Sequence, residues 1–302
     1  MTLIPPQRRR HQALPDKAAV WLGLLPAAGL LIVFFGLPIA QGVLLSFSRW
    51  PGLGGVHLTG LESYRLAFDQ PQIFHSLRLT FVYALVTAFA MTAIATLLAA
   101  AVSGRVRGSS FYRIVWFLPG MSPVVAVGIF WSTAMQPTTG FVNVVLGYLG
   151  LGNAHTWLAE SNTAIYPCIF ATVWAGAGFA FVLILGATEQ VPVALYEAAE
   201  LDGASAVRRF FSVTLPLIRP VVGVVGMLEF IWAANGFTLL WAMTRGGPGY
   251  ATSIVSVLIY REAFVFGDYG QASAMAVMSG LVLVVVGALI LRMTRSKHEG
   301  AM

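Results

Sequence analysis

Three acidic residues stand close together in a chain that is otherwise poor in charge. Glu197, Glu200 and Asp202 fall within six positions, although only 10% of the residues are charged and 58% are hydrophobic. Helical geometry places Glu197 and Glu200 beside Tyr196 on one side of a short helix. The other side is apolar, and its members are Ala194, Leu195, Ala198, Ala199 and Leu201. The pattern predicts a small amphipathic helix.

Such a helix could be used in two ways. Surface helices usually turn Lys and Arg toward anionic headgroups, so two carboxylates beside a tyrosine make a poor lipid anchor. They are better suited to a basic or amide-lined groove on another protein, which is the helix-in-groove mode of recognition. The alternative is a hairpin that merely lies on the membrane surface. We favour the docking interpretation.

The composition indicates whether the chain that carries this helix lies in water or in a lipid bilayer. A soluble domain is roughly 45–50% apolar and about 25% charged, and this chain lies far outside that range. An all-α integral membrane protein is expected, because a helix satisfies its own backbone groups across about 30 Å of hydrocarbon. The net charge of +6 is explained by attraction to anionic headgroups and requires no nucleic acid.

Six apolar runs are long enough to cross a bilayer. They lie at about 20–46, 77–102, 111–135, 163–187, 217–241 and 272–292. Five prolines fall inside these runs and are expected to kink the helices rather than to open loops: Pro26, Pro38, Pro119, Pro123 and Pro167. The first run continues well past a typical signal-peptide core, so it is expected to stay as an uncleaved span.

Basic residues set the expected orientation. With the N-terminus inside, 13 of the 18 Lys and Arg residues fall on cytoplasmic segments, in agreement with the positive-inside tendency. Both termini should then be cytoplasmic, and the acidic cluster lies in the cytoplasmic loop between the fourth and fifth spans. Pro192 suits the first turn of its helix, and Gly203 suits the left-handed residue that ends it.

A second short helix is expected after Gly203. Val207, Phe210 and Phe211 would lie on one face, and Arg208, Arg209 and Ser212 on the other. Pro216 and Pro220 would then mark the entry into the fifth span.

The fifth run carries side chains that are candidates for lining a path through the membrane: Glu229, Trp232, Asn235 and Thr238. Polar groups inside spans are costly and usually face the interior of the bundle. Glu229, Trp232 and Asn235 are spaced i, i+3 and i+6, which keeps them within about a third of the helix circumference. Tryptophan beside amide and carboxylate groups would suit a solute that presents both CH faces and hydroxyls, such as a sugar. The alternative is that these groups bind neighbouring helices to one another.

The residues that enzymes use are not arranged for catalysis. A phosphate-binding P-loop needs a lysine after glycine, and neither Lys17 nor Lys297 has that setting. The five histidines lack metal-ligand spacing. An ion-coupled secondary transporter is one possible function of a membrane protein of this size, but such transporters typically have inverted repeats and several buried carboxylates. Glu229 is the only clear carboxylate well inside a span.

The acidic loop carries a family resemblance. Glu197-Ala198-Ala199, then Gly203, and after nine residues Val213-Thr214-Leu215-Pro216 resemble the EAA loop of ATP-binding-cassette (ABC) importer permeases. That pattern is EAA, a glycine four positions on, and I-x-L-P at the end. Val213 replaces the usual isoleucine and keeps a β-branched apolar side chain. The stretch LDGAS at 201–205 is similar to the I-D-G-A context of the carbohydrate branch.

Further motifs support the resemblance. TRGGP at 244–248 is similar to the T-x-G-G-P element of one of the two permease types in sugar importers. SFSRW at 46–50 and Trp157-Leu158 resemble weaker family patterns, since aromatic residues belong at membrane interfaces anyway.

The resemblance implies a division of labour in a bacterial or archaeal cell membrane. Two related permease subunits would form the pathway for a sugar or sugar-like solute, and an extracytoplasmic binding protein would deliver it. Two nucleotide-binding ATPase subunits would bind ATP and Mg²⁺, so no cofactor is expected in this chain. The EAA helix would couple transport to ATP hydrolysis, with Glu197 as a polar anchor and Gly203 as the turn between helices. Ala198, Ala199, Asp202 and Pro216 complete the candidate coupling residues.

The expected organisation has four parts. They are a cytoplasmic tail (1–19), a first span with an outer loop (20–75), the importer transmembrane domain (76–292, with the EAA loop at 190–216) and a second cytoplasmic tail (293–302).

Overall fold

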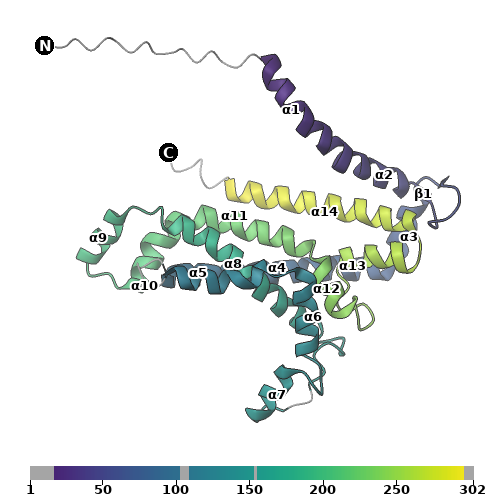
Figure 1. Cartoon of the computed structure of the whole chain (residues 1–302). Helices are drawn as coiled ribbons and strands as arrows, with labels where there is room; N and C mark the ends of the chain where they lie inside the picture. The colour runs from purple at the N-terminus through teal and green to yellow at the C-terminus, as the bar shows by residue number, and fades with distance from the viewer. Residues whose placement is uncertain (1–16, 103–108, 153–154, 296–302) are drawn as a thin grey trace.

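The computed structural model describes residues 17–102, 109–152 and 155–295, and these residues are mostly helical. A short antiparallel ribbon joins β1 (Ser48–Arg49) to β2 (His57–Leu58). Most of the expected N-terminal tail, and residues 296–302 of the C-terminal tail, lie outside the described residues. Apart from the first, the long apolar helices run side by side as a bundle (Figure 1), because each satisfies its own backbone and shares apolar surface with its neighbours.

Five continuous helical stretches are long and apolar enough to cross a membrane. They are Gly23–Ser46, Pro71–Val102, Ile165–Thr188, Ala206–Ala234 and Tyr269–Ala288. The first comprises most of α1 (Lys17–Leu31) with η1 (Ile32–Gly36) and α2 (Leu37–Ser46). The others are α4 (Pro71–Val102), α8 (Ile165–Thr188), α10 (Ala206–Arg209) running through η3 (Phe210–Thr214) into α11 (Leu215–Ala234), and α14 (Tyr269–Arg295).

The predicted third span is not one helix with a kink. The chain forms α5 (Ser109–Phe117), η2 (Leu118–Met121) and α6 (Val124–Ala134), and the two halves are bent by 91°. Ser122 and Pro123 have extended ψ angles of 141° and 128°, since a residue before proline avoids the helical region. The two prolines therefore break the run rather than kink it, and a sixth span exists only if the bent pair counts as one.

The fifth span begins and ends earlier than predicted. Its helix already includes Ala206, so the expected second short helix of the hairpin is the continuous start of the span. The helix ends at Ala234, where Asn235 has φ −96° and ψ 13° and Gly236 follows. Asn235 Nδ2 donates to the Ile231 carbonyl at 2.9 Å, and this local bond favours the end of the helix. The chain then turns into α12 (Phe237–Thr244).

Small side chains let the central helices α4, α8 and α11 approach closely. Buried alanines line the contact, among them Ala84, Ala95, Ala99, Ala171 and Ala180. Gly176 of α8 leaves room for Met91 of α4, and the ring of Trp232 from α11 would lie 3.4 Å from a Cβ at that position. This is the small-residue packing expected where lipid supplies no hydrophobic drive. Through these contacts α8 packs against α4, α5 and α11.

The first span stands apart from the rest (Figure 1). None of its apolar window is buried, although α2 lies along α14. Apolar side chains that are exposed within the chain must be covered by lipid or by another protein. Between this span and α4 lies the helix α3 (Glu62–Asp69).

Candidate functional site

The EAA loop forms a hairpin at one end of the bundle. Its helix α9 (Val193–Leu201) lies beyond the last turn of α8 and before the start of α10 (Figure 1). Pro192 caps the N-terminus of α9, and Gly203 has φ +76°, as predicted for the residue that reverses the chain. Two backbone bonds close the turn, from Gly203 N to the Glu200 carbonyl at 3.0 Å and from Ala204 N to the Ala199 carbonyl at 2.9 Å.

The two faces of α9 are divided differently from the prediction. Tyr196 is half-buried rather than on a free acidic face, and its hydroxyl lies 2.9 Å from Thr214 Oγ1. The same ring packs against a buried cluster that includes Val191 and Leu185. The amphipathic ring and hydroxyl of tyrosine explain the difference, since they serve as an anchor to the bundle. Glu197 is exposed.

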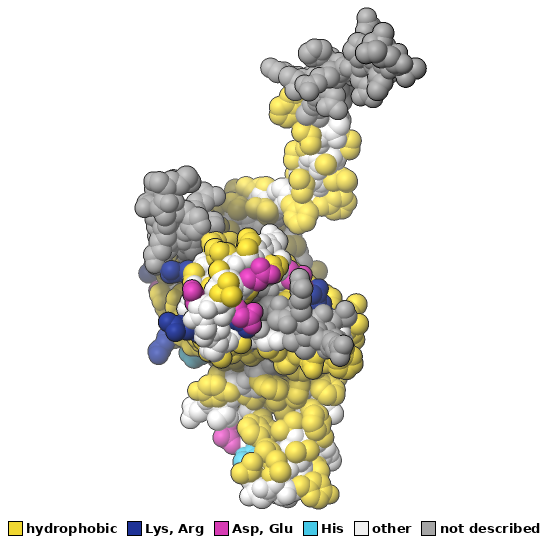
Figure 2. All heavy atoms as spheres, turned by 90° about the vertical axis from the view of Figure 1, so that its left-hand side faces the viewer, with side chains coloured by type: hydrophobic (Ala, Val, Ile, Leu, Met, Phe, Trp, Pro, Cys, Tyr) yellow, Lys and Arg dark blue, Asp and Glu magenta, His cyan; other side chains and the backbone are white. Residues whose placement is uncertain are grey.

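One ion pair connects the two arms of the hairpin, and a second lies beside it at the end of α8. Glu200 Oε1 lies 3.1 Å from Arg209 Nη1, which joins α9 to α10. Arg113 of α5 forms an ion pair with Glu189, directly after α8. Between them lies a cavity of about 710 Å³ lined in part by Glu197 and Glu200. Figure 2 shows acidic and basic side chains gathered together on this end of the molecule.

The remaining surface of α9 has no cover within the described chain. Leu201 is 89% exposed and Leu195 is 42% exposed, and Glu197 and Ala198 are exposed as well. A short helix that offers apolar and acidic side chains together, while anchored by Tyr196 on its other side, is suited to a groove on another protein. Of the other candidate residues, Asp202 is the C-cap of α9 and Pro216 lies in the first turn of α11.

The structure does not bring the four candidate translocation residues together. Glu229 is buried in α11, whereas Trp232 is 45% exposed and lies against Gly176 of α8. Asn235 caps the helix and lines a separate cavity of about 90 Å³ with Ser256 and Ser279. Thr238 belongs to α12 and is exposed. Only Glu229 and Trp232 share a helix, because the span ends before Asn235.

The TRGGP element turns the chain between α12 and α13 (Val255–Tyr260). Arg245 has φ +52° and Gly246 has φ +85°, so two successive residues are left-handed. Thr252 Oγ1 bonds the Gly247 carbonyl at 2.9 Å and lies 2.6 Å from Thr244 Oγ1. A Cβ on Gly246 would meet Val257 at 2.8 Å. After α13, η4 (Arg261–Val265) leads toward α14.

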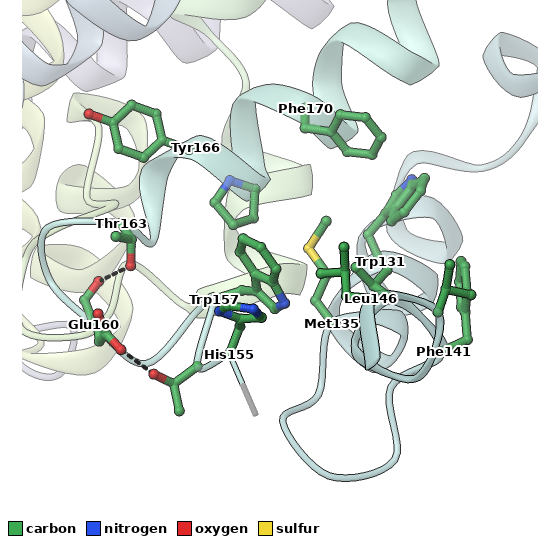
Figure 3. A pocket seen from close by; sticks show the side chains of 14 residues that line it. Trp131, Met135, Phe141, Leu146, His155, Trp157, Glu160, Thr163, Tyr166 and Phe170 are labelled. Atoms are coloured by element: carbon green, nitrogen blue, oxygen red, sulfur yellow. Dashed lines mark hydrogen bonds between the residues drawn. The ribbon is translucent and has the colours of Figure 1, made fainter. Parts of the chain in front are cut away.

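Sequence reasoning missed an aromatic pocket at the opposite end of α8. It has a volume of about 690 Å³ and lies between α6, α7 (Phe141–Tyr148), the loop 155–163 and the first turns of α8 (Figure 3). Its walls include Trp131, Phe141, Trp157 and Phe170. The tryptophans gave a weak signal in the sequence, since interfaces are rich in them.

Asn143 of α7 holds this outer pocket together. Its side chain is 1% exposed, and its Nδ2 donates to the carbonyls of Gln136, Pro137 and His155 at 3.1, 3.2 and 2.9 Å. Its Oδ1 accepts from Trp157 Nε1 at 2.9 Å. One amide thus fixes two loops and an aromatic wall.

Comparison with known proteins identifies the family. Residues 93–296 match the profile of the binding-protein-dependent transport system inner membrane component. The diacetylchitobiose uptake system permease protein NgcF of Streptomyces coelicolor is 32% identical over 307 residues, which covers 97% of this chain and 87% of that protein. The sn-glycerol-3-phosphate transport system permease protein UgpA of Pectobacterium atrosepticum is 31% identical over 275 residues, covering 89% and 90%.

A solved structure supports the fold. It is a bacterial ABC transporter involved in the import of the acidic polysaccharide alginate, with a TM-score of 0.81 and 23% identity, covering 92% of this chain and 96% of that chain. These matches favour an importer over the ion-coupled alternative. The chain belongs to the family of binding-protein-dependent inner membrane components and is the non-catalytic, multi-pass permease of an ABC importer.

Proposed function

We propose that this permease forms half of the translocation pathway for a sugar or sugar-like solute. The similar permeases from Streptomyces and Pectobacterium are named for diacetylchitobiose and for sn-glycerol-3-phosphate, which are both small hydroxylated solutes. The LDGAS context of the hairpin supports the carbohydrate branch. Glu229 and Trp232 are the candidates for contact with the solute, followed by Asn235 and Thr238 near the turn into α12.

The hairpin couples this pathway to ATP hydrolysis in a separate subunit. The observation that carries the proposal is α9 itself, a helix anchored to the bundle by Tyr196 and exposed on the side of Glu197 and Leu201. Motion of the partner would pass through Tyr196 and the Glu200–Arg209 pair into α10 and α11, because these helices are continuous. Residues Ala198 and Ala199 keep that helix narrow enough to enter a groove.

The assembly we propose contains a second, related permease, two ATPase subunits and an extracytoplasmic solute-binding protein. ATP and Mg²⁺ bind to the ATPase subunits. Both termini and the hairpin lie in the cytoplasm, which agrees with the positive-inside tendency. The first span, whose apolar window has no buried residue, supports a neighbouring permease as well as lipid around this chain.

Variants of the hairpin test the coupling. Glu197→Ala and Gly203→Val should assemble with the other subunits but lose most of the ATPase stimulation by solute-loaded binding protein. No heavy atom lies within 4 Å of the place that a Cβ on Gly203 would occupy, so valine there strains only the backbone, by about 1–2 kcal/mol. Gly203→Asn is the matched control, because asparagine tolerates the left-handed region.

Three results are informative. Loss of stimulation in Gly203→Val with recovery in Gly203→Asn supports the turn as part of the coupling element. Normal stimulation and uptake in both Glu197→Ala and Gly203→Val, in complexes of normal composition, would contradict the coupling role. Purification of the tagged permease without any ATPase subunit, from cells that express the whole operon, would contradict the proposed assembly.

A further inference from the structure

The outer aromatic pocket has the build of a small-molecule site. Ligand cavities commonly measure roughly 300–1,000 Å³ and combine apolar walls with a few polar groups. This one has a volume of about 690 Å³. Aromatic rings from α6, α7 and α8 stand around it, and its polar groups are gathered on the wall made by residues 155–163 (Figure 3).

The polar wall distinguishes this pocket from a simple lipid groove. His155 packs its ring near Trp157, with centroids 4.9 Å apart, and Glu160 accepts a hydrogen bond from Thr156. Tyr166 adds a phenol at the rim and is 64% exposed. His155 Nε2 and Glu160 Oε1 already have hydrogen-bond partners within the chain, but a hydrocarbon occupant would leave the other carboxylate oxygen of Glu160 and the Tyr166 hydroxyl facing an apolar surface, which is unfavourable. An amphipathic ligand would satisfy both walls.

The charges of the lining select among amphipathic ligands. Neither Lys nor Arg is among the lining residues in the described chain, and Glu160 is the only carboxylate there. Phosphate groups are bound by Arg, Lys or clustered backbone N–H groups, and a carboxylate repels them. Both a phospholipid headgroup and a phosphorylated solute are therefore disfavoured. A neutral saccharide fits, since its CH faces stack on aromatic rings and its hydroxyls donate to a carboxylate.

We infer that this outer pocket is a binding site for an uncharged saccharide. It lies by the first turns of α8, whereas the coupling hairpin follows the last turn of the same 24-residue helix, about 35 Å away along the axis. With the hairpin in the cytoplasm, the pocket faces the side from which solute arrives. The site rests on the proposed function and sharpens it, because it selects neutral sugars over phosphate-bearing ones.

Two substitutions on α7 test the site. Leu146 lines the pocket and Val144 does not, and both lie on the same short helix. Leu146→Trp should fill the pocket, while Val144→Trp adds the same ring to an exposed face. The purified complex of both permeases and the ATPase, in lipid nanodiscs without binding protein, would be tested for binding of radiolabelled diacetylchitobiose, cellobiose and maltose. Uptake of the same sugars by the complete complex would be measured in parallel.

We expect at least one neutral disaccharide to bind to the parent complex and to Val144→Trp, and the affinity to fall about tenfold or more in Leu146→Trp. Glycerol 3-phosphate should not compete. In Glu160→Lys it should begin to compete, while Glu160→Gln should not show this change, because only lysine supplies a cation.

The outcomes separate the two proposals. Equal binding in Leu146→Trp and Val144→Trp, or no binding of any of the three sugars, overturns the pocket, and saccharide uptake in the same experiment leaves the proposed function standing. Binding sensitive to Leu146→Trp without any uptake supports the pocket and counts against sugar transport. A structure of the assembled complex with a side chain of the second permease filling the pocket would also overturn the inference.

Discussion

The two ends of α8 are built in different ways. At the hairpin end, charged side chains meet across exposed ion pairs, and one left-handed glycine reverses the chain. At the outer end, aromatic rings line an open pocket, and one buried asparagine has four hydrogen-bond partners. The hairpin end presents an exposed helix surface, whereas the outer end holds its loops together through buried contacts within the chain.

This difference shows which part of the permease is held in one conformation by contacts within the chain and which part depends on a partner. Exposed ion pairs contribute little individually, so the hairpin depends on its turn, on Tyr196 and on whatever occupies its open face. The outer end depends on a buried polar group whose partners are all internal, and such networks define a single arrangement. We therefore expect substitutions at the outer end to change folding and those at the hairpin to change coupling.

The largest loss of folding stability is expected from a substitution in the middle of α8, the helix that connects the two ends. A Cβ on Gly178 would collide with the backbone of Trp116 and Phe117, at the end of α5 in the first half of the bent pair. Because backbone cannot move aside like a side chain, Gly178→Val should destabilise the fold by about 3 kcal/mol or more, at the upper end for overpacking. Thermal unfolding in nanodiscs measures this. Gly186→Val is the control, since no heavy atom lies within 4 Å of the place that a Cβ on Gly186 would occupy. An equal loss of unfolding temperature in both variants would contradict the prediction.

A smaller loss of stability is expected from a substitution of Asn143 at the outer end. Asn143→Ala removes the NH2 group, whose two hydrogens are shared among three carbonyls, and leaves Trp157 Nε1 without its acceptor, for a cost of about 2–3 kcal/mol. Limited proteolysis should then cut within residues 136–163 in the variant before the parent chain is cut. Asn162→Ala is the matched control, because Asn162 is exposed. Protection of the loop in Asn143→Ala would show that the aromatic packing suffices.

The hairpin could be predicted from sequence because local geometry dictates it. Pro192 and Gly203 mark where α9 begins and ends, and their conformations depend on neighbouring residues rather than on the fold. Length and hydropathy also decide which runs can cross a membrane, and five of the six predicted runs overlap a continuous membrane-length helix, whereas the third is a bent pair. The role of Tyr196 was not, because its partner Thr214 is 18 residues away.

The outer end could not be predicted because its contacts are distant in sequence. Asn143 joins Pro137 to Trp157, and Trp131 reaches Phe170 with ring centroids 4.8 Å apart. Periodicity reports a face of one helix and not which faces meet. The same limit explains the third span. Neighbouring helices can satisfy the backbone groups that a proline frees, which would leave only a kink, but here the run with Pro119 and Pro123 is broken.

At the hairpin, loss of one anchor should loosen α9 without unfolding the bundle. Tyr196→Phe keeps the ring packed and removes the bond to Thr214, at a cost of about 1 kcal/mol. We expect faster amide exchange in residues 193–201, several-fold weaker ATPase stimulation and an unchanged unfolding temperature. Tyr148→Phe, at a tyrosine that is 88% exposed, should change none of these. A drop in the unfolding temperature as large as that of Asn143→Ala would remove the distinction between the two ends.

The smallest effect should come from the ion pair between Arg113 and Glu189. Both side chains are half-exposed, so solvent and salt screen their attraction. Glu189→Gln should therefore lower ATPase stimulation less than twofold at low salt and not at all at high salt. A double-mutant cycle with Arg113→Gln isolates the pair from other contacts of Arg113. Strong, salt-independent coupling would mean that a bound partner covers this pair and excludes water, which would make it part of the interface rather than of the support.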